Sequence, residues 1–465
     1  MVGETRRRMM SLCSAFALAW LATPPLLAAA LTLEVDAGAT DRAETPVSAE
    51  IALPADLADA PAAELVAELE GPEGKVPGQL VPAAEKGKAT LCWIVGLLKA
   101  GQKAAYKATL SRGKGEAKGF VLQDQPGQLL DLLFDGRRVT RFMYARDAST
   151  KEKNFLTYKP FLHVFDSKGE RVITNDHGQP FPHHRGIFLG WRVKMGDGKT
   201  AYNFWEMAGG VCQRVDKFTE QDAGPVLGRL RAAIRWEDPK GQPVILEERE
   251  LTVHRQSKPE LLLDFVSTLR SQAGDLLLDG DPEHGGCQFR ASDEVRTAFK
   301  LPEAPVVDHG KDVEFVAKGV TVRVPKDAYR KDPAYKAYSE EFKKKAVDQI
   351  KAEGKDTRYL LPPGMKEGLK GTVDMPWATV SLTIGDSRFN IAHLNHPTNP
   401  KGTIYSANRD YGRFGAFPKT PLKADQPLVV RYRFFVREAA TPLTADEAQR
   451  LYADFATPPQ ITVRP

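Results

Sequence analysis

The sequence has 465 residues, with 65 lysines and arginines against 60 aspartates and glutamates and a formal net charge of +5. This length is enough for two or three domains with sizeable hydrophobic cores. The basic excess is small and spread along the chain, without a basic helix or an RNA-recognition aromatic pattern, so nucleic acid is not an expected partner.

The first 30 residues have the features of a secretory signal peptide. Residues 6–8 are three arginines, an apolar segment spans residues 9–27, and residues 28–30 are the small alanines that signal peptidase requires. Two prolines at 24–25 interrupt the apolar segment, and no other long apolar segment follows, which argues against a membrane anchor. We therefore expect an exported protein, periplasmic or secreted, that starts near Leu31 and has no membrane span.

Three cysteines follow the signal peptide: Cys92, Cys212 and Cys287. Their odd number and wide spacing do not match a metal-binding framework of the CxxC type. An oxidising compartment allows one disulfide among them. Buried free thiols are the state that we expect.

Residues 31–119 are predicted to form a small immunoglobulin-like β-sandwich. The segments that alternate apolar and polar residues as strands do are 31–35, 47–53, 64–69 and 89–95. The charged, glycine-rich segment 113–119 is typical of a connector, so the domain boundary is placed there. Nothing in this domain indicates chemistry, and we interpret it as an accessory module.

Residues 120–465 are predicted to form a large antiparallel β supersandwich, which makes the fold class mainly all-β. The clearest strand patterns are 129–134, 139–144, 226–236, 244–254 and 260–269. Many long antiparallel strands over so long a stretch favour one double-sheet sandwich over several small domains.

Two helices are predicted within this region. The first is an insertion at about 326–354, expected to cover part of the sandwich, and it ends at Gly354. Its apolar residues recur at a spacing of three to four: Tyr335, Tyr338, Phe342, Ala346 and Ile350. The second helix begins at the capping residue Thr444 and runs to Phe455.

The segment 160–191 holds four of the nine histidines, in a loop between two strand-like runs at 161–165 and 186–191. Prolines 180 and 182 are expected to hold His183, His184 and Arg185 extended, so that only one of the two imidazoles faces a given cavity. A stiff loop that ends in two imidazoles and a guanidinium favours a functional site. The alternative is an ordinary hairpin whose histidines bond to backbone.

Three further clusters place polar groups beside Pro or Gly at the margin of a predicted strand. The first, 279–286, contains His284; the second, 390–400, contains His393 and His396; the third, 409–415, combines arginines with aromatic rings. A single histidine is more often a satisfied core or loop residue. All the clusters nevertheless place polar groups beside Pro or Gly at a strand margin, and this shared feature favours one common site.

Together these segments resemble an exported family known as PmoA-like, catalogued as a domain of unknown function and labelled a methane oxygenase. The motifs that carry the resemblance are 183–186 (HHRG), 203–206 (NFWE), 283–286 (EHGG), 396–400 (HPTNP) and 409–415 (RDYGRFG). The resemblance covers roughly residues 123–438. It implies a supersandwich like that of galactose mutarotases and several polysaccharide lyases, in proteins associated with carbohydrate-degrading bacteria.

The resemblance and the residues favour an exported carbohydrate-active enzyme: a lyase, hydrolase or epimerase that acts on a sugar or an oxidised or uronic sugar. His183, His184 and His284 are the predicted acid and base, because imidazole changes charge near neutral pH. Glu206 would orient a histidine or form a surface salt bridge. Other side chains are predicted to stack on sugar rings or to bond hydroxyls and carboxylates: Arg185, Trp205, His396, Asn399, Arg409 and Tyr411.

Two alternatives stay open. One is a non-catalytic module that binds an oligosaccharide or a partner protein with the same side chains. The other is a metal-dependent enzyme, including the oxygenase that the family label suggests. In that case the histidine doublet, His284 and His396 would hold a divalent ion of Zn, Cu, Mn or Fe, although no HExxH or HxH motif is present.

Overall fold

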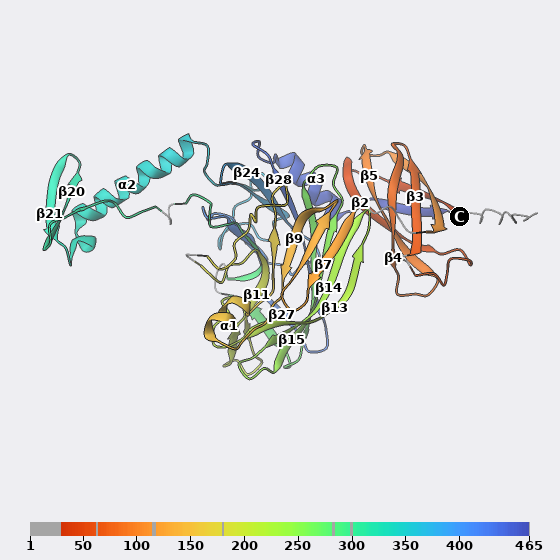
Figure 1. The fold of residues 1–465 in the computed structure, drawn as a ribbon, viewed down its shortest axis with the longest axis horizontal. Helices are drawn as coiled ribbons and strands as arrows, with labels where there is room; N and C mark the ends of the chain where they lie inside the picture. Colours follow the sequence, from red (N-terminus) through yellow and green to blue (C-terminus); the bar gives the residue numbers. More distant parts are fainter. Residues whose placement is uncertain are drawn as a thin grey trace, which may run out of the picture.

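The computed structural model describes residues 29–61, 64–113, 118–178, 181–280, 284–297 and 301–464, and most of them lie in antiparallel β-strands (Figure 1). The expected signal peptide lies outside the described residues except for positions 29 and 30, and so does most of the expected connector at 113–119. In the described part, the strands form sheets of seven, eleven, eight and three strands. The mainly antiparallel β fold class predicted from the sequence is confirmed.

The seven-stranded sheet forms the N-terminal sandwich, coloured red and orange in Figure 1. Trp93 and Tyr106 lie in its core, 0% and 1% exposed, with ring centroids 5.8 Å apart. Its pairing order is β2-β5-β4-β3-β6-β1-β29. The strands are β1 (Ala29–Asp36), β2 (Arg42–Ala52), β3 (Leu65–Gly71), β4 (Gly74–Pro82), β5 (Lys88–Leu98), β6 (Lys103–Arg112) and β29 (Gln460–Arg464).

The edge strand of this sandwich, β29, comes from the other end of the chain. It pairs antiparallel with β1, with Val35 opposite Ile461 and Leu33 opposite Val463. A buried ion pair of 2.9 Å between Arg42 and Asp454 ties the two chain ends together nearby. The predicted boundary at 119 misses this return, because five residues after a helix carry little pattern of their own.

Deleting residues 460–465 is expected to loosen β1 without disturbing the rest of the chain. The deletion removes the β1–β29 ladder and exposes β1 as a new sheet edge. Hydrogen–deuterium exchange of the β1 amides should rise about tenfold. The matched control is Thr462→Ala, whose side chain is exposed and whose backbone pairing is kept. Unchanged β1 exchange in the deletion would contradict a structural role for β29.

The two large sheets form the body of the protein. The eight-stranded sheet runs β13 (Cys212–Ala223), β14 (Leu227–Glu237), β15 (Pro243–His254), β16 (Leu261–Ser271), β28 (Leu428–Glu438), β24 (Ser387–Asn395), β23 (Trp377–Ile384) and β22 (Arg358–Leu360). The eleven-stranded sheet runs β25 (Ile404–Ser406), β26 (Arg413–Phe417), β18 (Gly285–Arg290), β11 (Ile187–Lys194), β10 (Phe161–Val164), β9 (Arg137–Met143), β8 (Leu129–Phe134) and β7 (Phe120–Gln125), with β12 (Ala201–Asn203), β17 (Leu276–Asp279) and β27 (Thr420–Leu422) beside it.

Aromatic contacts between the two large sheets show that they pack face to face. Trp191 on β11 and Trp236 on β14 stack with ring centroids 6.2 Å apart, and both are 0% exposed. His393 on β24 and Phe414 on β26 make a second contact at 6.0 Å. One large core fills the space between the sheets, as a double-sheet sandwich requires.

Three α-helices occur in the described part. The predicted C-terminal helix is α3 (Ala445–Ala456), and its Thr444 and Glu447 form a capping box. The helix of the insertion is α2 (Pro333–Ala352), which starts later than predicted because Asp332 caps it and a proline occupies its first turn. The short helix α1 (Lys151–Thr157) was not predicted.

The insertion does not cover the sandwich, contrary to the prediction. Figure 1 shows α2 projecting away from the body together with β20 and β21. Phe315 and Tyr335, with ring centroids 5.4 Å apart, are part of a small core of its own. The additional elements are β19 (Val307–Asp308), β20 (Asp312–Ala317), β21 (Val320–Pro325) and a 3₁₀ turn (Tyr329–Lys331).

The cysteines that follow the expected signal peptide are free thiols. Cys92, Cys212 and Cys287 are all buried, as predicted. Within the described ranges, no helix has the length and apolar character needed to cross a membrane.

Candidate functional site

The histidine loop connects β10 and β11, which pair with Leu162 opposite Ile187. Gly186 ends the loop with a left-handed φ of 45°, and a Cβ there would lie 2.2 Å from the Leu162 carbonyl oxygen, so glycine is required. The loop is not extended as predicted. The His184 N–H donates to the Phe181 carbonyl at 2.9 Å, which closes a tight turn.

This turn brings both imidazoles together, although only one was predicted to face a given cavity. The ring centroids of His183 and His184 lie 4.2 Å apart. The His184 ring is 5.7 Å from Trp205, and the Trp205 ring is 6.0 Å from His284. Two of the three histidines predicted as acid and base therefore lie against one indole, and the third, His183, lies against His184. We call His183, His184, His284 and Trp205 the histidine cluster.

Burial keeps the two neighbouring imidazoles of the cluster neutral. The pKa of His183 is lowered from 6.5 to about 3, mainly by loss of water and then by the charges of Lys159, His284 and Arg413. The pKa of His184 is lowered well below 6.5, again chiefly by burial. At pH 7 each ring therefore offers one N–H donor and one acceptor nitrogen.

Neutral buried histidines predict that the protein loses stability in acid. Burial lowers the pKa of His163 to about 4 and of His393 to about 3, as it lowers that of His183. Between pH 6.5 and about 3 the unfolded chain binds more protons than the folded chain, so the free energy of unfolding falls as pH falls. Urea unfolding should show a loss of roughly 1–2 kcal/mol per group at pH 5.

Replacing His393 with glutamine should reduce that pH dependence by the share of one group, while the exposed His309→Gln should leave it unchanged. Wild-type stability that stays level from pH 7 to pH 4 would contradict this account.

A buried lysine lies beside the histidine cluster and was missed by the sequence analysis. Lys159 is 2% exposed, donates from Nζ to the Trp205 carbonyl at 3.0 Å, and lies 4.1 Å from the ring centroid of Phe188. Burial, followed by the charges of Arg185 and Arg249, lowers its pKa well below 10.5. Lys159 is a single lysine before an apolar strand, and no sequence pattern indicates that such a residue is buried.

Several buried polar atoms in the histidine cluster have no hydrogen-bond partner within the described structure: Nδ1 and Nε2 of His184, Nε2 of His183 and Nε1 of Trp205. His184 and Trp205 are only 2% and 1% exposed. A buried polar group left unsatisfied costs about 1–3 kcal/mol, so native proteins meet such groups with protein, water or ligand. Their concentration here is what a site for a polar ligand requires.

Trp205 and Tyr411 were predicted to stack on a sugar ring, but both are buried, at 1% and 3% exposure. The Tyr411 ring lies 5.4 Å from Phe181 of the histidine loop and 4.8 Å from the guanidinium carbon of Arg290. The Trp205 ring therefore packs against imidazoles of the cluster, and the Tyr411 ring packs against Phe181 of the histidine loop. They do not offer an open face for stacking.

Glu206 and Arg409, two more predicted substrate contacts, bond to other residues of the protein. Glu206 is exposed, and its carboxylate accepts from the Asn203 amide at 2.9 Å. Its charge raises the pKa of Lys159, against the larger effects that lower it. The Arg409 carbonyl accepts from the Tyr359 hydroxyl at 2.7 Å.

Arg185 and Asn399 were predicted to contact substrate. In the structure their side chains form hydrogen bonds with backbone groups of the protein. The buried Arg185 guanidinium donates to the carbonyls of Phe155 at 2.7 Å and Leu156 at 2.8 Å, and so satisfies the C-terminal end of α1. The Asn399 amide pairs with the backbone of Arg431 on β28, at 2.6 and 2.7 Å. Both side chains support the fold.

His396 is not brought to the histidine cluster. Its ring centroid lies 4.9 Å from Phe455 of α3, and its Nδ1 lies 2.8 Å from the Thr398 hydroxyl oxygen. The predicted metal ligands are thus divided between two places. Among the described residues, no three His, Cys, Asp or Glu side chains gather as a metal-binding group.

A protein family described as being of unknown function, DUF6807, matches residues 129–453. The chain belongs to this family. The match spans most of the body, including the histidine cluster, and leaves out the N-terminal sandwich. No curated protein matches the chain.

Among solved structures, the chain is similar to the GalM/aldose epimerase homologue from C. elegans, with 9% identity over 70% of this chain and 100% of that chain and a TM-score of 0.23. At this identity and TM-score, the likeness assigns no residue and no activity to the DUF6807 chain.

Proposed function

We propose that this DUF6807 protein is a carbohydrate-active enzyme whose histidine cluster performs acid–base chemistry on a sugar with a carboxylate or carbonyl group. The observation that carries the proposal is His184, whose two ring nitrogens are buried without a partner, next to a second imidazole and an indole. Neutral imidazole both accepts and donates a proton, which is what such chemistry requires.

The charges around the histidine cluster favour an acidic sugar. Lys159 and Arg413 act on both His183 and His184 and lower their pKa values, and Arg290 also acts on His184. A bound carboxylate would offset these charges and raise the imidazole pKa toward neutrality, where a general base works best. The same cations would stabilise the oxyanion that forms when a proton is removed beside a carboxylate or carbonyl.

Exposure suggests which residue takes which role. His183 and His284 are partly exposed, whereas His184 and Trp205 are buried behind them. A sugar would therefore approach from the side of His183 and His284, with one as base and the other as acid. His184 and the indole N–H of Trp205 would hold its polar groups.

A screen of uronic-acid-containing and oxidised glycosides, each paired with its neutral counterpart, tests this proposal by product formation. We expect turnover of at least one acidic sugar and at least a tenfold loss with its neutral counterpart. Saturable binding without turnover would favour the alternative, a non-catalytic sugar-binding module. Turnover of neutral sugars alone would overturn the role proposed for the cations.

We also propose that the protein is exported, as the basic and apolar pattern of residues 6–27 suggests. The mature chain should then begin near Leu31, which N-terminal sequencing of protein from the producing cell measures. A chain that retains residues 1–30 would contradict export by cleavage. The resemblance to the PmoA-like family stays a prediction.

A further inference from the structure

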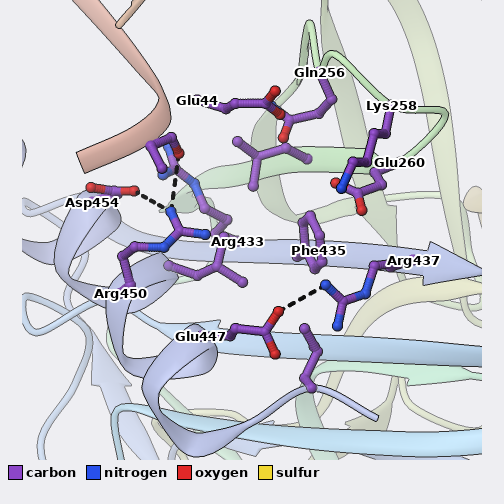
Figure 2. Close-up of a pocket in the computed structure, with 14 residues that line it drawn as sticks. Glu44, Gln256, Lys258, Glu260, Arg433, Phe435, Arg437, Glu447, Arg450 and Asp454 are labelled. Carbon is purple, nitrogen blue, oxygen red and sulfur yellow. Dashed lines mark hydrogen bonds and ion pairs between the residues drawn. The ribbon is translucent and has the colours of Figure 1, made fainter. Parts of the chain in front are cut away.

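A pocket lies where the N-terminal sandwich meets the body, and it shares no residue with the histidine cluster. Its volume is about 220 Å³ (Figure 2). It is lined by residues from β2, from the loop between β15 and β16 with the start of β16, from β28, and from α3 with the segment before it. The four segments come from both ends and the middle of the chain. The pocket therefore exists only in the assembled fold.

The centre of this junction pocket is apolar. Phe435 presents an aromatic ring there and is 5% exposed, and three buried leucines complete the apolar surface: Leu262, Leu443 and Leu451. Polar and charged side chains surround this centre in Figure 2, with Glu44 and Gln256 on one side and Lys258 and Glu260 on another. An apolar centre with polar groups of both signs around it matches the two surfaces of a sugar ring.

Some charges of the junction pocket are already paired. Arg437 donates to Glu447 at 2.8 Å, and Arg450 donates to the Ala43 carbonyl at 3.0 Å. These contacts fix the wall formed by α3 and β28. They leave other groups of the pocket to interact with a ligand.

Glu44, Lys258 and Glu260 also line the pocket. Burial raises the pKa of Glu260, and the charges of Glu44 and Glu447 add to that effect, while those of Arg437 and Lys258 oppose it. The Glu44 carboxylate makes only a long contact of 3.4 Å with the Ser257 N–H. Hydroxyl groups of a ligand would give these carboxylates donors in place of water.

The backbone at Glu44 has a strained conformation of the kind that is found at ligand-binding sites. Glu44 has a φ of 52° within strand β2, a left-handed conformation that side-chain-bearing residues avoid. Such outliers cost on the order of 1 kcal/mol or more and persist where the surroundings hold them. Here the strain accompanies a carboxylate at the mouth of the pocket.

We propose that the junction pocket is a second, non-catalytic site that binds a single neutral saccharide ring. The volume of about 220 Å³ is below the range of about 300–1,000 Å³ typical of larger ligands, so one ring fits and a chain does not. The apolar face of the ring packs on Phe435, and its hydroxyls bond Glu44, Lys258 and Glu260. Because the walls come from both domains, the bound sugar strengthens their contact.

Isothermal titration with methyl glycopyranosides tests the proposal, because a methyl group on the anomeric oxygen makes them poor substrates for ring-opening chemistry. The probes are the methyl glycosides of glucose, galactose and xylose. We expect saturable binding of at least one probe, weakened at least tenfold by Lys258→Ala and by Glu44→Gln. Both positions are at least partly exposed, so the variants should fold.

Two controls separate this site from the histidine cluster. Lys240→Ala removes an exposed lysine from a distant turn, and His183→Ala alters the cluster; neither should change the affinity. The proposal is overturned if none of the three probes binds, or if Lys258→Ala and Glu44→Gln bind as the wild type does. Loss of binding in His183→Ala would assign the sugar to the histidine cluster and also overturn it.

Discussion

Replacing His183 or His284 with alanine is expected to lower kcat/KM by about 10²–10⁴-fold on the acidic sugar that the wild type turns over. His183 and His284 are the partly exposed imidazoles that a substrate reaches, and each is the predicted donor or acceptor of a proton. Steady-state kinetics measures the effect. Circular dichroism should show wild-type folding, since neither side chain is fully buried.

The matched control is His309→Ala in the insertion, where the imidazole lies 3.5 Å from Glu314 and is exposed. It should keep wild-type kinetics. If His183→Ala and His284→Ala both turn over substrate at the wild-type rate, acid–base catalysis by the histidine cluster is wrong.

Replacing Glu247 with alanine is expected to lower the free energy of unfolding by about 3–5 kcal/mol. Glu247 is 2% exposed and accepts from Arg249 at 2.7 and 2.9 Å, from the Trp236 indole at 2.7 Å and from the Ser267 hydroxyl at 2.9 Å. The substitution leaves the Arg249 charge, itself 1% exposed, without its carboxylate. Urea unfolding at pH 7, followed by tryptophan fluorescence, measures the loss.

The neighbouring Glu248 provides the control for this buried pair. Its side chain is 55% exposed and lies 3.8 Å from Arg231, so Glu248→Ala should cost less than about 1 kcal/mol. Equal unfolding midpoints for the Glu247 and Glu248 variants would contradict a structural role for the buried pair.

Some long strands of the body were predicted to within one or two residues, whereas others, such as β13 and β28, were not predicted. The segments expected at 226–236 and 244–254 are β14 at Leu227–Glu237 and β15 at Pro243–His254. Each alternates buried side chains with partly or fully exposed ones over many residues, which is a local signal. The capping box at Thr444 is local as well, and it marks the start of α3 correctly.

What the sequence did not reveal depends on contacts between distant segments. Arg185 looked like a ligand for substrate, but its partners are the carbonyls of Phe155 and Leu156, about 30 positions away. His396 lies away from His183 because the end of β24 packs against α3. A sequence motif carries no information about this packing. The turn at Phe181 that joins the two imidazoles is likewise a tertiary outcome, because the loop is held by the Asn175 side chain.

The most direct test of the account is nitrogen NMR of the imidazole rings in protein labelled with ¹⁵N-histidine, titrated with D-glucuronate and D-galacturonate at pH 7. The account predicts neutral rings for His183 and His184 before addition. At saturation it predicts shifts of the His183, His184 and His284 nitrogens, while those of His309 stay in place. Cluster nitrogens that remain unmoved at saturating concentrations of a sugar acid that the protein turns over would contradict the account.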